Sequence, residues 1–408
     1  MSQDPLALLA TLLQLPAPWK VTGYQIDPVA KTLHITLQWP PEYFPLCPVC
    51  NEQVPTHDHR AARYWQHLSC MGYRTELICK LPRARCPRHG VHSVKTPWAD
   101  PSSRMTRDQE SYCIQVLLAC PTVTAAAELL ELSYDTVHQV RQRAVQRGLL
   151  RRDCSQVQRL CIDDKSFRRG SSFVTIVSAL DQGRVLEVTP ERTKQAAVDA
   201  LSSLPESVRQ QVTAVAQDMW DPYQRAVEQV LPQAAIVHDR FHIVKHLNDA
   251  VNKVRRAENA ELKAKGDLTL SGKRFVFLKN PQNWSQNEAD AFAAMQHMEL
   301  KVSRAWRLKE LFGQLYFYHS ETWARKFFAR WFASATHSRL PLLSKVAWMI
   351  KNRLDNVVSY AEHRITNAVA EGLNSKIQSL KAAARGFRNF AHYRIAILFH
   401  CGGLQLAP

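Results

Sequence analysis

The sequence has no uninterrupted apolar run long enough to span a bilayer, so we do not expect a membrane protein. Its opening stretch, MSQDPLALLATLLQLPAPWK, carries an acid early and lacks the basic start of an export signal. We interpret this stretch as a short amphipathic helix ended by Pro16 and Pro18. Together, these absences predict a cytoplasmic protein.

Acidic residues are scarce relative to basic ones: Asp and Glu total 36, whereas Lys and Arg total 53. The formal net charge of +17 and the pI of about 9.6 are typical of proteins that bind phosphate, in nucleic acid or on an anionic membrane. A solvated basic surface without such a partner is the alternative. With 46% hydrophobic and 22% charged residues over 408 positions, the composition is globular and predicts about two to four domains.

The chain has 10 cysteines without an export signal, and close cysteine pairs in a reducing compartment bind zinc more often than they form disulfides. The segments CPVC and CPRH place Cys47 and Cys50 on one knuckle and Cys86 and His89 on another. Four such ligands complete a tetrahedral structural Zn²⁺ site. We therefore predict a zinc-ribbon-like β domain over residues 1–105.

Other side chains compete with these four ligands. HDH at 57–59 and His92 offer imidazoles close to the knuckles. A buried pair of free cysteines with a surface histidine is a further interpretation. Cys70 and Cys79 have the sequence context of core residues.

Residues 106–152 have a helical pattern that Pro121 interrupts. Ser133 is a suitable N-cap for the last helix of this segment. A short helix, a tight turn and a polar second helix are typical of a helix-turn-helix that reads the DNA major groove. A plain helical hairpin has the same periodicity and is the alternative.

The last helix of this segment should bury one stripe, formed by Val137, Val140 and Ala144. Tyr134 and Asp135 should be exposed. We expect the other polar side chains of the helix to be exposed as well and to contact DNA, namely His138, Gln139, Arg141, Gln142 and Arg143.

A different pattern begins near residue 153. Strand-like runs in VQRLCIDD, SSFVTIVSAL and RVLEVTP precede a helix, the run VTAVAQDM, another helix and the run AAIVHDRFHIV. This order predicts an α/β RNase H-like catalytic domain, in which the first and fourth strands are neighbours. Asp163 and Asp218 end those two strands, so we expect their carboxylates to meet.

Phosphodiester chemistry with two metal ions requires a third acid, since two carboxylates hold a divalent cation loosely. The helical segment 364–390 presents Glu371 away from its apolar stripe, and oxygen ligands favour Mg²⁺ or Mn²⁺. Arg385 and Arg388 add positive charge nearby for DNA. Taken singly, an Asp at a strand end is usually a turn or cap residue, and a Glu on a polar helix face is usually solvated.

Four segments together resemble the DDE transposases of the ISL3 insertion-sequence family: IDDKSFRRG, DMWDPYQRAV, PQAAIVHDRFHIV and TNAVAEGLNSKIQSLKAAARGFRN. The resemblance covers most of the chain, including CPVC and the helix-turn-helix. It implies that Asp163, Asp218 and Glu371 are the catalytic acids and hold two Mg²⁺ or Mn²⁺ ions. Asp164 stands where the family often has Glu, which leaves open which of the two adjacent acids binds metal.

The segment DRFH resembles the D/C-x-x-H motif of transposases whose catalytic domain carries an insertion. It implies that Asp239 and His242 support the site. A capping Asp and a core His are the alternative interpretation.

The interval between Asp218 and Glu371 is longer than one loop and helix need, which predicts an all-α insertion at 246–360. The catalytic domain would then comprise 153–245 and 361–408. Most tryptophans of the insertion should be core residues, although in related insertion domains an aromatic side chain stacks on a displaced base. The candidates are Trp306, Trp323, Trp331 and Trp348.

The resemblance implies an enzyme that binds the terminal inverted repeats of an insertion sequence, cleaves a DNA strand and joins it to target DNA. Two DNA ends must meet, so we expect a homodimer or larger assembly on double-stranded DNA, associated with the bacterial nucleoid. A catalytically inactive sequence-specific DNA-binding regulator and a structure-specific RNase H-fold nuclease are the alternatives.

Overall fold

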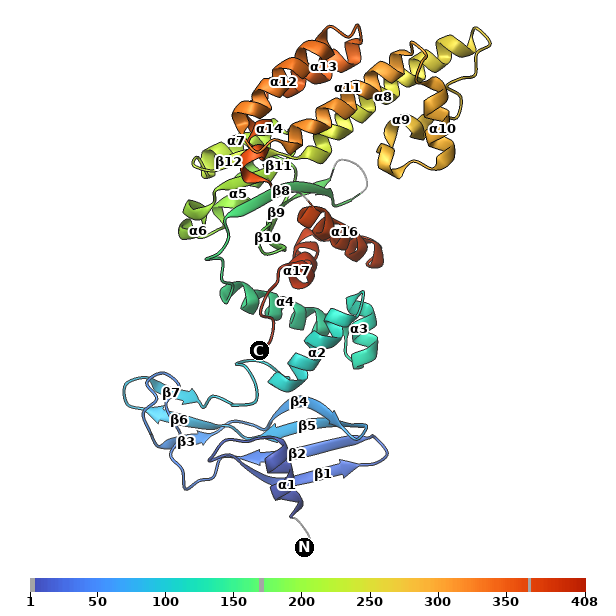
Figure 1. The fold of residues 1–408 in the computed structure, drawn as a ribbon. Helices are drawn as coiled ribbons and strands as arrows, with labels where there is room; N and C mark the ends of the chain where they lie inside the picture. The colour runs from blue at the N-terminus through green and yellow to red at the C-terminus, as the bar shows by residue number, and fades with distance from the viewer. Residues whose placement is uncertain (1–3, 169–171, 366–367) are drawn as a thin grey trace. The chain divides into compact units, whose positions relative to one another are not determined.

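The computed structural model describes residues 4–168, 172–365 and 368–408 (Figure 1). The chain forms two compact units, one of residues 1–152 with 404–408 and one of residues 153–403. Each unit has hydrophobic core clusters of its own.

The first unit begins with a helix, α1 (Pro5–Leu12), and a four-stranded sheet. The strands, in spatial order, are β1 (Lys20–Asp27), β2 (Thr32–Gln38), β5 (Tyr73–Cys79) and β4 (Arg63–Cys70). Side chains alternate between buried and exposed along β2 and β5, as expected for a sheet with one covered face. The core contains Trp19, Trp65 and Trp98, whose rings pack edge to face with centroids 4.7 and 5.5 Å apart.

A second sheet of the first unit has three strands. In spatial order they are β3 (Thr56–His59), β6 (Pro82–Cys86) and β7 (Gly90–Ser93). Its buried apolar core consists of Cys47, Val54, Ala84 and Cys86. So small a core buries too little apolar surface to hold a sheet by itself.

Three helices follow: α2 (Arg107–Ala119), α3 (Val123–Leu130) and α4 (Tyr134–Leu150). Each is capped by a hydroxyl, because Thr106, Thr122 and Ser133 accept the N–H of the residue three positions on. The predicted Ser133 cap is thus confirmed. Glu131 adopts a left-handed conformation with φ of 53° and ends α3, which makes the turn before α4 tight.

The last residues of the chain pack against α4. Arg147 Nη1 donates to the carbonyl of Leu406 at 2.8 Å, and Arg151 Nη1 donates to that of Ala407 at 2.7 Å. A Cβ at Gly148 would lie 2.7 Å from the Cβ of Leu404, so the close approach requires glycine. Residues 404–408 accordingly group with the first unit.

The second unit is built on a five-stranded sheet. In spatial order its strands are β10 (Arg184–Pro190), β9 (Phe173–Ala179), β8 (Arg159–Ser166), β11 (Ala214–Gln217) and β12 (Ala235–His238). β8, β11 and β12 are parallel, whereas β9 is antiparallel to β8 and β10. The expected adjacency of the first and fourth strands of this segment is confirmed, because β8 pairs with β11.

One face of this sheet carries Leu160, Ile162, Val215 and Ile236 in a shared core with three helices. These helices are α5 (Lys194–Ser202), α6 (Glu206–Gln211) and α7 (Asp221–Val230). Side chains of a strand alternate between faces, so Cys161, Ala216 and Val237 point to the other side.

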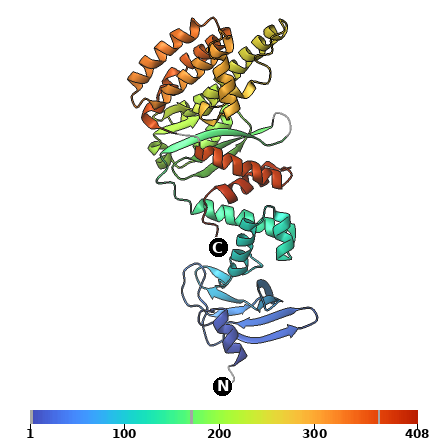
Figure 2. The same ribbon diagram turned by 45° about the vertical axis from the view of Figure 1, so that its right-hand side comes forward.

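That other face packs against a helical region, in which α8 and α11 run side by side (Figures 1 and 2). The elements are α8 (Arg240–Lys263), α9 (Arg274–Leu278), η1 (Pro281–Asn283), α10 (Gln286–Met295), α11 (Lys301–Gly313), η2 (Gln314–Phe317), α12 (Glu321–Thr336), α13 (Pro341–Lys351), α14 (Leu354–Val358) and α15 (Tyr360–His363). Helix α8 starts directly after β12 and passes through the predicted border at 245/246. The helices share one core with the sheet and lie in the same compact unit as it does.

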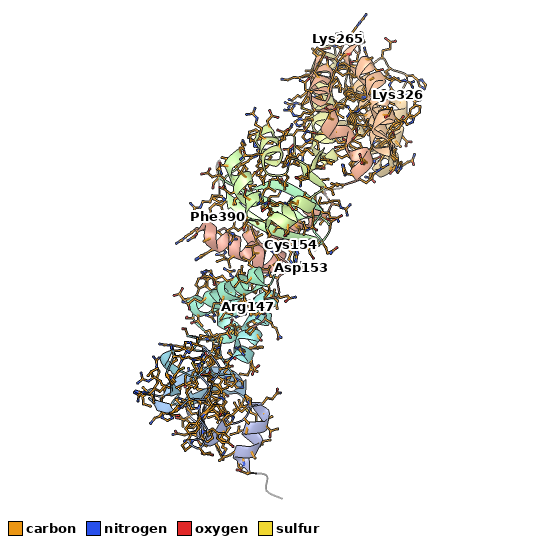
Figure 3. The ribbon with its side chains drawn as sticks, turned by 90° about the vertical axis from the view of Figure 1, so that its left-hand side faces the viewer. Arg147, Asp153, Cys154, Lys265, Lys326 and Phe390 are labelled. Atoms are coloured by element: carbon orange, nitrogen blue, oxygen red, sulfur yellow. The ribbon has the colours of Figure 1, made fainter. Side chains whose placement is uncertain are left out.

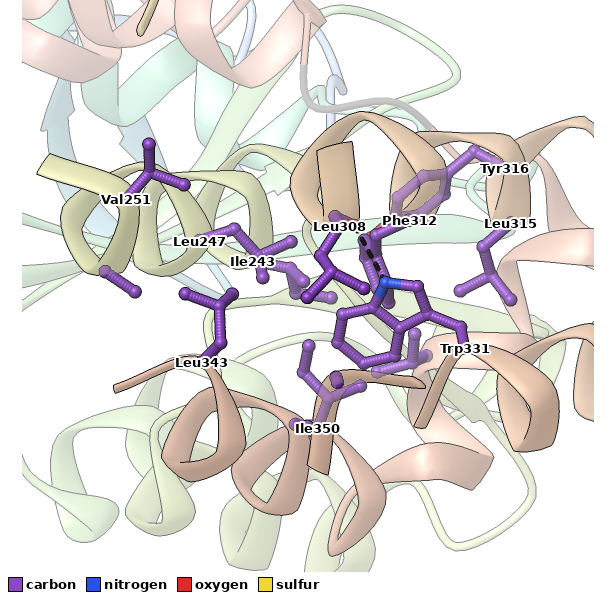
Figure 4. Close-up of a cluster of buried hydrophobic side chains, with 14 of the residues drawn as sticks. Ile243, Leu247, Val251, Leu308, Phe312, Leu315, Tyr316, Trp331, Leu343 and Ile350 are labelled. Atoms are coloured by element: carbon purple, nitrogen blue, oxygen red, sulfur yellow. Dashed lines mark hydrogen bonds between the residues drawn. The ribbon is translucent and has the colours of Figure 1, made fainter. Parts of the chain in front are cut away.

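Figure 4 shows the centre of this core, where Trp331 Nε1 donates to the carbonyl of Leu308 at 2.8 Å. Trp331 is buried and Trp306 is partly buried, as expected for core residues. Trp323 and Trp348 are exposed. Lys326, labelled in Figure 3, lies over the Trp323 ring, with Nζ 4.6 Å from the ring centroid.

Two further helices, α16 (Ala368–Ala383) and α17 (Phe390–Cys401), pack against each other. Phe390, labelled in Figure 3, begins α17. Arg394 of α17 donates to both carboxylate oxygens of Glu187 on β10, at 2.6 and 2.7 Å, which ties α17 to the sheet edge. Over the described parts of the chain, the structure contains no helix with the length and apolarity that a membrane crossing requires.

Candidate catalytic, zinc and DNA-binding sites

Three aspartates form a row across neighbouring parallel strands. Asp218 and Asp239 directly follow β11 and β12, whereas Asp163 lies inside β8, which continues to Ser166, so the expectation that this strand ends at Asp163 is wrong. Gln217 pairs in register with Ile162 on one side and His238 on the other, so the next residues, Asp163, Asp218 and Asp239, continue that register. Strand alternation places all three on the sheet face that the helical region covers. The predicted neighbours Asp163 and Asp218 therefore lie at matching positions on adjacent chain segments.

Asp163 is held by donors from two distant parts of the sequence. Its Oδ1 accepts the N–H of Asp164 at 2.7 Å. Its Oδ2 accepts the amide of Asn374 on α16 at 2.6 Å and lies 3.2 Å from Lys165 Nζ. These contacts fix the carboxylate and bring α16 to the end of β8.

Arg192 connects the acids to an aromatic ring. Its Nε lies 2.9 Å from Asp164 Oδ1, without pointing its N–H at that oxygen, and its Nη2 lies 3.8 Å from Asp218 Oδ2. Its guanidinium stacks 4.5 Å from the centroid of Trp220. Burial raises the pKa of Asp164, Arg192 opposes this rise, and the charges of Asp163 and Asp218 add to it.

Asp239 and His242 lie beside this row. Asp239 caps α8 by accepting the N–H of Phe241 at 3.0 Å, as the capping interpretation expected. His242 Nδ1 lies 3.0 Å from Asp239 Oδ2 and 4.0 Å from Asp218 Oδ1. The Asp239 carboxylate raises the pKa of His242 against the effect of burial, and Asp218 and Asp163 add to the rise. Asp239 therefore caps α8, and the same side chain holds His242 beside Asp218.

Glu371 is exposed in the first turn of α16. Asn374, which contacts Asp163, follows it by three residues, so both lie on the same helix face. Within the described residues, ligand atoms of three or more His, Cys, Asp or Glu side chains all lie within 4.8 Å of one another at the Cys/His set described next. The carboxylates of Asp163, Asp218 and Glu371 do not converge to that separation, although as oxygen ligands they suit Mg²⁺ or Mn²⁺.

The predicted zinc ligands Cys47, Cys50, Cys86 and His89 come together, with all four ligand atoms within 4.8 Å of one another. The Sγ atoms of Cys50 and Cys86 are 3.9 Å apart, and His89 Nδ1 lies 3.8 Å from Cys47 Sγ and 3.4 Å from Cys86 Sγ. Two thiolates on one tetrahedral Zn²⁺ lie about 3.8 Å apart. The donor set and its spacing therefore fit zinc.

The chemistry around these thiols also suits a metal. The N–H groups of Cys50 and Val49 lower the pKa of Cys47 to about 6 against the effect of burial. Within the described residues, none of the cysteines forms a disulfide. Two of the competing imidazoles have other partners, since His57 Nδ1 lies 3.3 Å from Asp58 Oδ2 and His92 Nε2 contacts the carbonyl of His89.

The expected exposure of helix α4 is wrong at three positions. His138 and Arg141 are buried and contact each other at 3.1 Å, and burial lowers the pKa of Arg141 to about 10. Arg143 is half-buried and donates to the buried Glu110 at 2.8 Å. The buried arc extends one residue beyond the expected stripe, because positions 138, 141, 145 and 148 adjoin it at helical spacing. Gln139 and Gln142 are exposed as predicted.

Arg385 and Arg388 are exposed in the turn between α16 and α17. Both line a hollow that also contains Arg168 and Lys381. Arg192, Asn374 and Arg168 were not predicted as site residues, because each reaches the site through tertiary packing.

Known proteins resemble the chain over most of its length. Residues 160–397 match the transposase family profile of the ISL3 group, and residues 94–145 match the helix-turn-helix domain of transposase family ISL3. The transposase for insertion sequence element IS1001 of Bordetella parapertussis is 25% identical over 385 residues, which are 92% of this chain and 94% of that protein. The transposase for insertion sequence element IS1557 of Mycobacterium tuberculosis is 25% identical over 368 residues, 84% of this chain and 82% of that protein.

These matches define the class of the chain as a transposase with a helix-turn-helix. The chain belongs to the ISL3 family of transposases, as the resemblance of its sequence motifs implied.

Proposed function

We propose that the chain is a DDE transposase that binds the terminal inverted repeats of an insertion sequence, cleaves a DNA strand there and transfers it to target DNA. The observation that carries this proposal is the register of β8 and β11, in which Ile162 pairs with Gln217, so that Asp163 and Asp218 are the next residues on the two chain segments. The sheet order β10-β9-β8-β11-β12 supports an RNase H-like catalytic core. In the relatives named above, the printed function is that of an insertion-sequence transposase.

In this proposal Asp163, Asp218 and Glu371 would hold two Mg²⁺ or Mn²⁺ ions, which would activate a water molecule and stabilise the leaving 3′ oxygen. Asn374 orients the Asp163 carboxylate, and Arg192 balances the charge of Asp164 and Asp218. The released 3′-OH attacks a target phosphodiester by the same in-line displacement. The enzyme forms no covalent intermediate with DNA.

The DNA-binding part comprises the zinc-stabilised domain at 1–105 and the helix-turn-helix at 106–152. The catalytic part comprises 153–245 and 361–408 around an all-α insertion at 246–360. Phosphate contacts set the register on DNA, and base contacts from α4 give specificity. Because two DNA ends must be joined to one target, the active species is a homodimer or larger assembly on double-stranded DNA in the bacterial nucleoid.

The direct test is a Mg²⁺-dependent cleavage assay on duplexes that carry one end of the element that encodes this chain, with a scrambled duplex as control. We expect cleavage at the end sequence, and we expect Glu371→Gln to abolish cleavage while leaving end binding intact. Binding without cleavage by the wild-type protein would indicate a catalytically inactive regulator. Cleavage of branched DNA without regard to the end sequence would indicate a structure-specific nuclease.

A second expectation concerns sequence reading by α4. Gln139 and Gln142 are exposed near the start of the helix, and an amide side chain pairs with adenine through two hydrogen bonds worth about 1–3 kcal/mol of discrimination. Replacing either residue with Ala should reduce the preference for the end sequence over a scrambled duplex by about 5- to 150-fold. Gln115→Ala removes an exposed glutamine of α2 and should leave the preference unchanged.

For each variant, fluorescence anisotropy measures the affinity for the end sequence and the affinity for the scrambled duplex. The ratio of these two affinities is the preference. Equal preference in the wild-type and both α4 variants would exclude α4 as the reading helix.

A further inference from the structure

A hollow of about 920 Å³ lies where the end of β8 meets the end of α16. Its polar lining includes Arg168, Gln378, Lys381, Arg385 and Arg388. None of the described lining residues is acidic, and within the described chain none of these four cations pairs with a carboxylate. Four clustered cations without a neutralising acid repel one another, so the hollow favours an anionic ligand.

Backbone and side-chain contacts build the hollow. Lys381 Nζ donates to the carbonyl of Ser166 at 2.6 Å, and the Arg168 guanidinium donates to the carbonyl of Arg388. Arg385 ends α16 in a left-handed conformation with φ of 52°, which costs an arginine about 1–2 kcal/mol. Glycine is the usual residue at such a helix end and adopts this conformation at a lower free-energy cost. Position 385 therefore carries a cation although glycine would form the turn more favourably.

The hollow and the candidate catalytic acid share one face of α16. Residues 371, 374, 378 and 381 are spaced by three and four positions, which places them on one face of α16, and Arg385 lies in the turn two residues after the helix ends. The face follows β8 from Asp163 to Ser166, because Asn374 contacts Asp163 and Lys381 contacts Ser166. At about 1.5 Å per residue, Lys381 lies about 15 Å along the axis from Glu371, and Arg385 lies beyond it.

The dipole of α16 accounts for part of this charge, since its carboxyl end attracts a cation such as Lys381. It does not account for Arg168 and Arg388, which come from outside the helix and face the same hollow. The convergence of three chain segments on one open cationic hollow indicates a ligand with more than one negative charge.

We propose that this hollow binds backbone phosphates of the DNA end on which the acids act. This inference rests on the proposed function and adds the position of the bound strand. At about 3.4 Å of axial rise per nucleotide in B-form DNA, the span of about 15 Å to Lys381 and the longer span to Arg385 place the bound phosphates about four to six nucleotides from the scissile one. The strand thus follows the α16 face from Glu371 to Lys381 and the turn that holds Arg385.

The test uses the full chain, with Arg385 and Arg388 both replaced by Gln, and a duplex that carries one end of the element. The matched control replaces Arg256 and Lys345, two exposed cations of α8 and α13 that are not part of the hollow. The slope of log K against log salt is negative. Removing about two phosphate contacts should make it less steep by about 1.8 in the hollow variant. The control variant should keep the wild-type slope.

Phosphate position is tested by placing one neutral methylphosphonate at a time along each strand of the duplex. In the wild-type protein, neutralising phosphates about four to six nucleotides from the cleavage site should weaken binding; in the hollow variant the same changes should have little effect. The inference would be overturned if the wild-type protein and the hollow variant had equal slopes and equal sensitivity to neutralised phosphates. Binding is measured separately from cleavage, so absence of cleavage by the wild-type protein would count against the proposed function alone.

Discussion

We expect the replacement of Asp218 with Asn to lower the rate of Mg²⁺-dependent strand cleavage on the order of a thousandfold, equivalent to about 4 kcal/mol of transition-state stabilisation. In the wild-type protein, Asp218 Oδ1 accepts the N–H of Met219 at 2.6 Å. Asn has the size of Asp and keeps an oxygen that can accept this N–H. It removes the negative charge that a divalent cation requires in an oxygen site. The variant should therefore fold and bind the DNA end as the wild type does, and lose chemistry alone.

Asp221→Asn is the matched control. Asp221 lies three residues further on, is exposed at the start of α7 and pairs with Arg353 at 2.7 Å. An exposed pair of this kind contributes about 0–1 kcal/mol to stability, so cleavage should stay within about twofold of wild type. Single-turnover cleavage of a labelled DNA end measures both variants. The assignment of Asp218 as a catalytic acid would be contradicted if Asp218→Asn cleaved within about tenfold of the wild-type rate. It would also be contradicted if Asp221→Asn lost as much cleavage rate as Asp218→Asn.

We expect the replacement of Cys86 with Ser to abolish zinc binding and to unfold the small sheet of the first unit. That sheet has the small core described above, so its folding depends on metal binding, which contributes about 10–16 kcal/mol in isolated zinc-finger peptides. We expect elemental analysis to find about one Zn²⁺ per wild-type chain and almost none in the variant. End binding should fall with it, since the folded sheet is part of the DNA-binding unit in this account.

Cys79→Ala is the control for this experiment. Cys79 is buried in β5, and burial raises the pKa of its thiol to about 12, so it stays protonated and is a poor ligand. This variant should keep its zinc and lose only the packing of one small side chain, about 1 kcal/mol. Retention of one zinc by Cys86→Ser, or loss of zinc by Cys79→Ala, would exclude the proposed ligand set.

The parts of the site that were predictable from sequence depend on short-range spacing. The pairs CPVC and CPRH bring two ligands together within one turn, so only the meeting of the two knuckles had to be inferred. Asp163 and Asp218 follow strand-like runs, and the order of strands and helices predicted that those two runs are adjacent. Ser133 is a cap because its hydroxyl acts on a neighbour three residues away.

The parts that were not predictable depend on packing between distant segments. Asn374 meets Asp163 across 211 residues, and Arg192 reaches the acids from the loop after β10. Helical periodicity locates the centre of the buried face of α4 but not its width, which is why His138 and Arg141 were expected to be exposed. The position of Glu371 relative to the two aspartates likewise depends on how α16 docks against β8.

That last relation is the central claim, and anomalous X-ray scattering from Mn²⁺ in crystals of the protein with a bound DNA end tests it most directly. The account predicts two Mn²⁺ peaks about 3.5–4 Å apart, with carboxylate oxygens of Asp163, Asp218 and Glu371 among their ligands. Peaks coordinated without Glu371, or no peak beside Asp163 and Asp218, would contradict it.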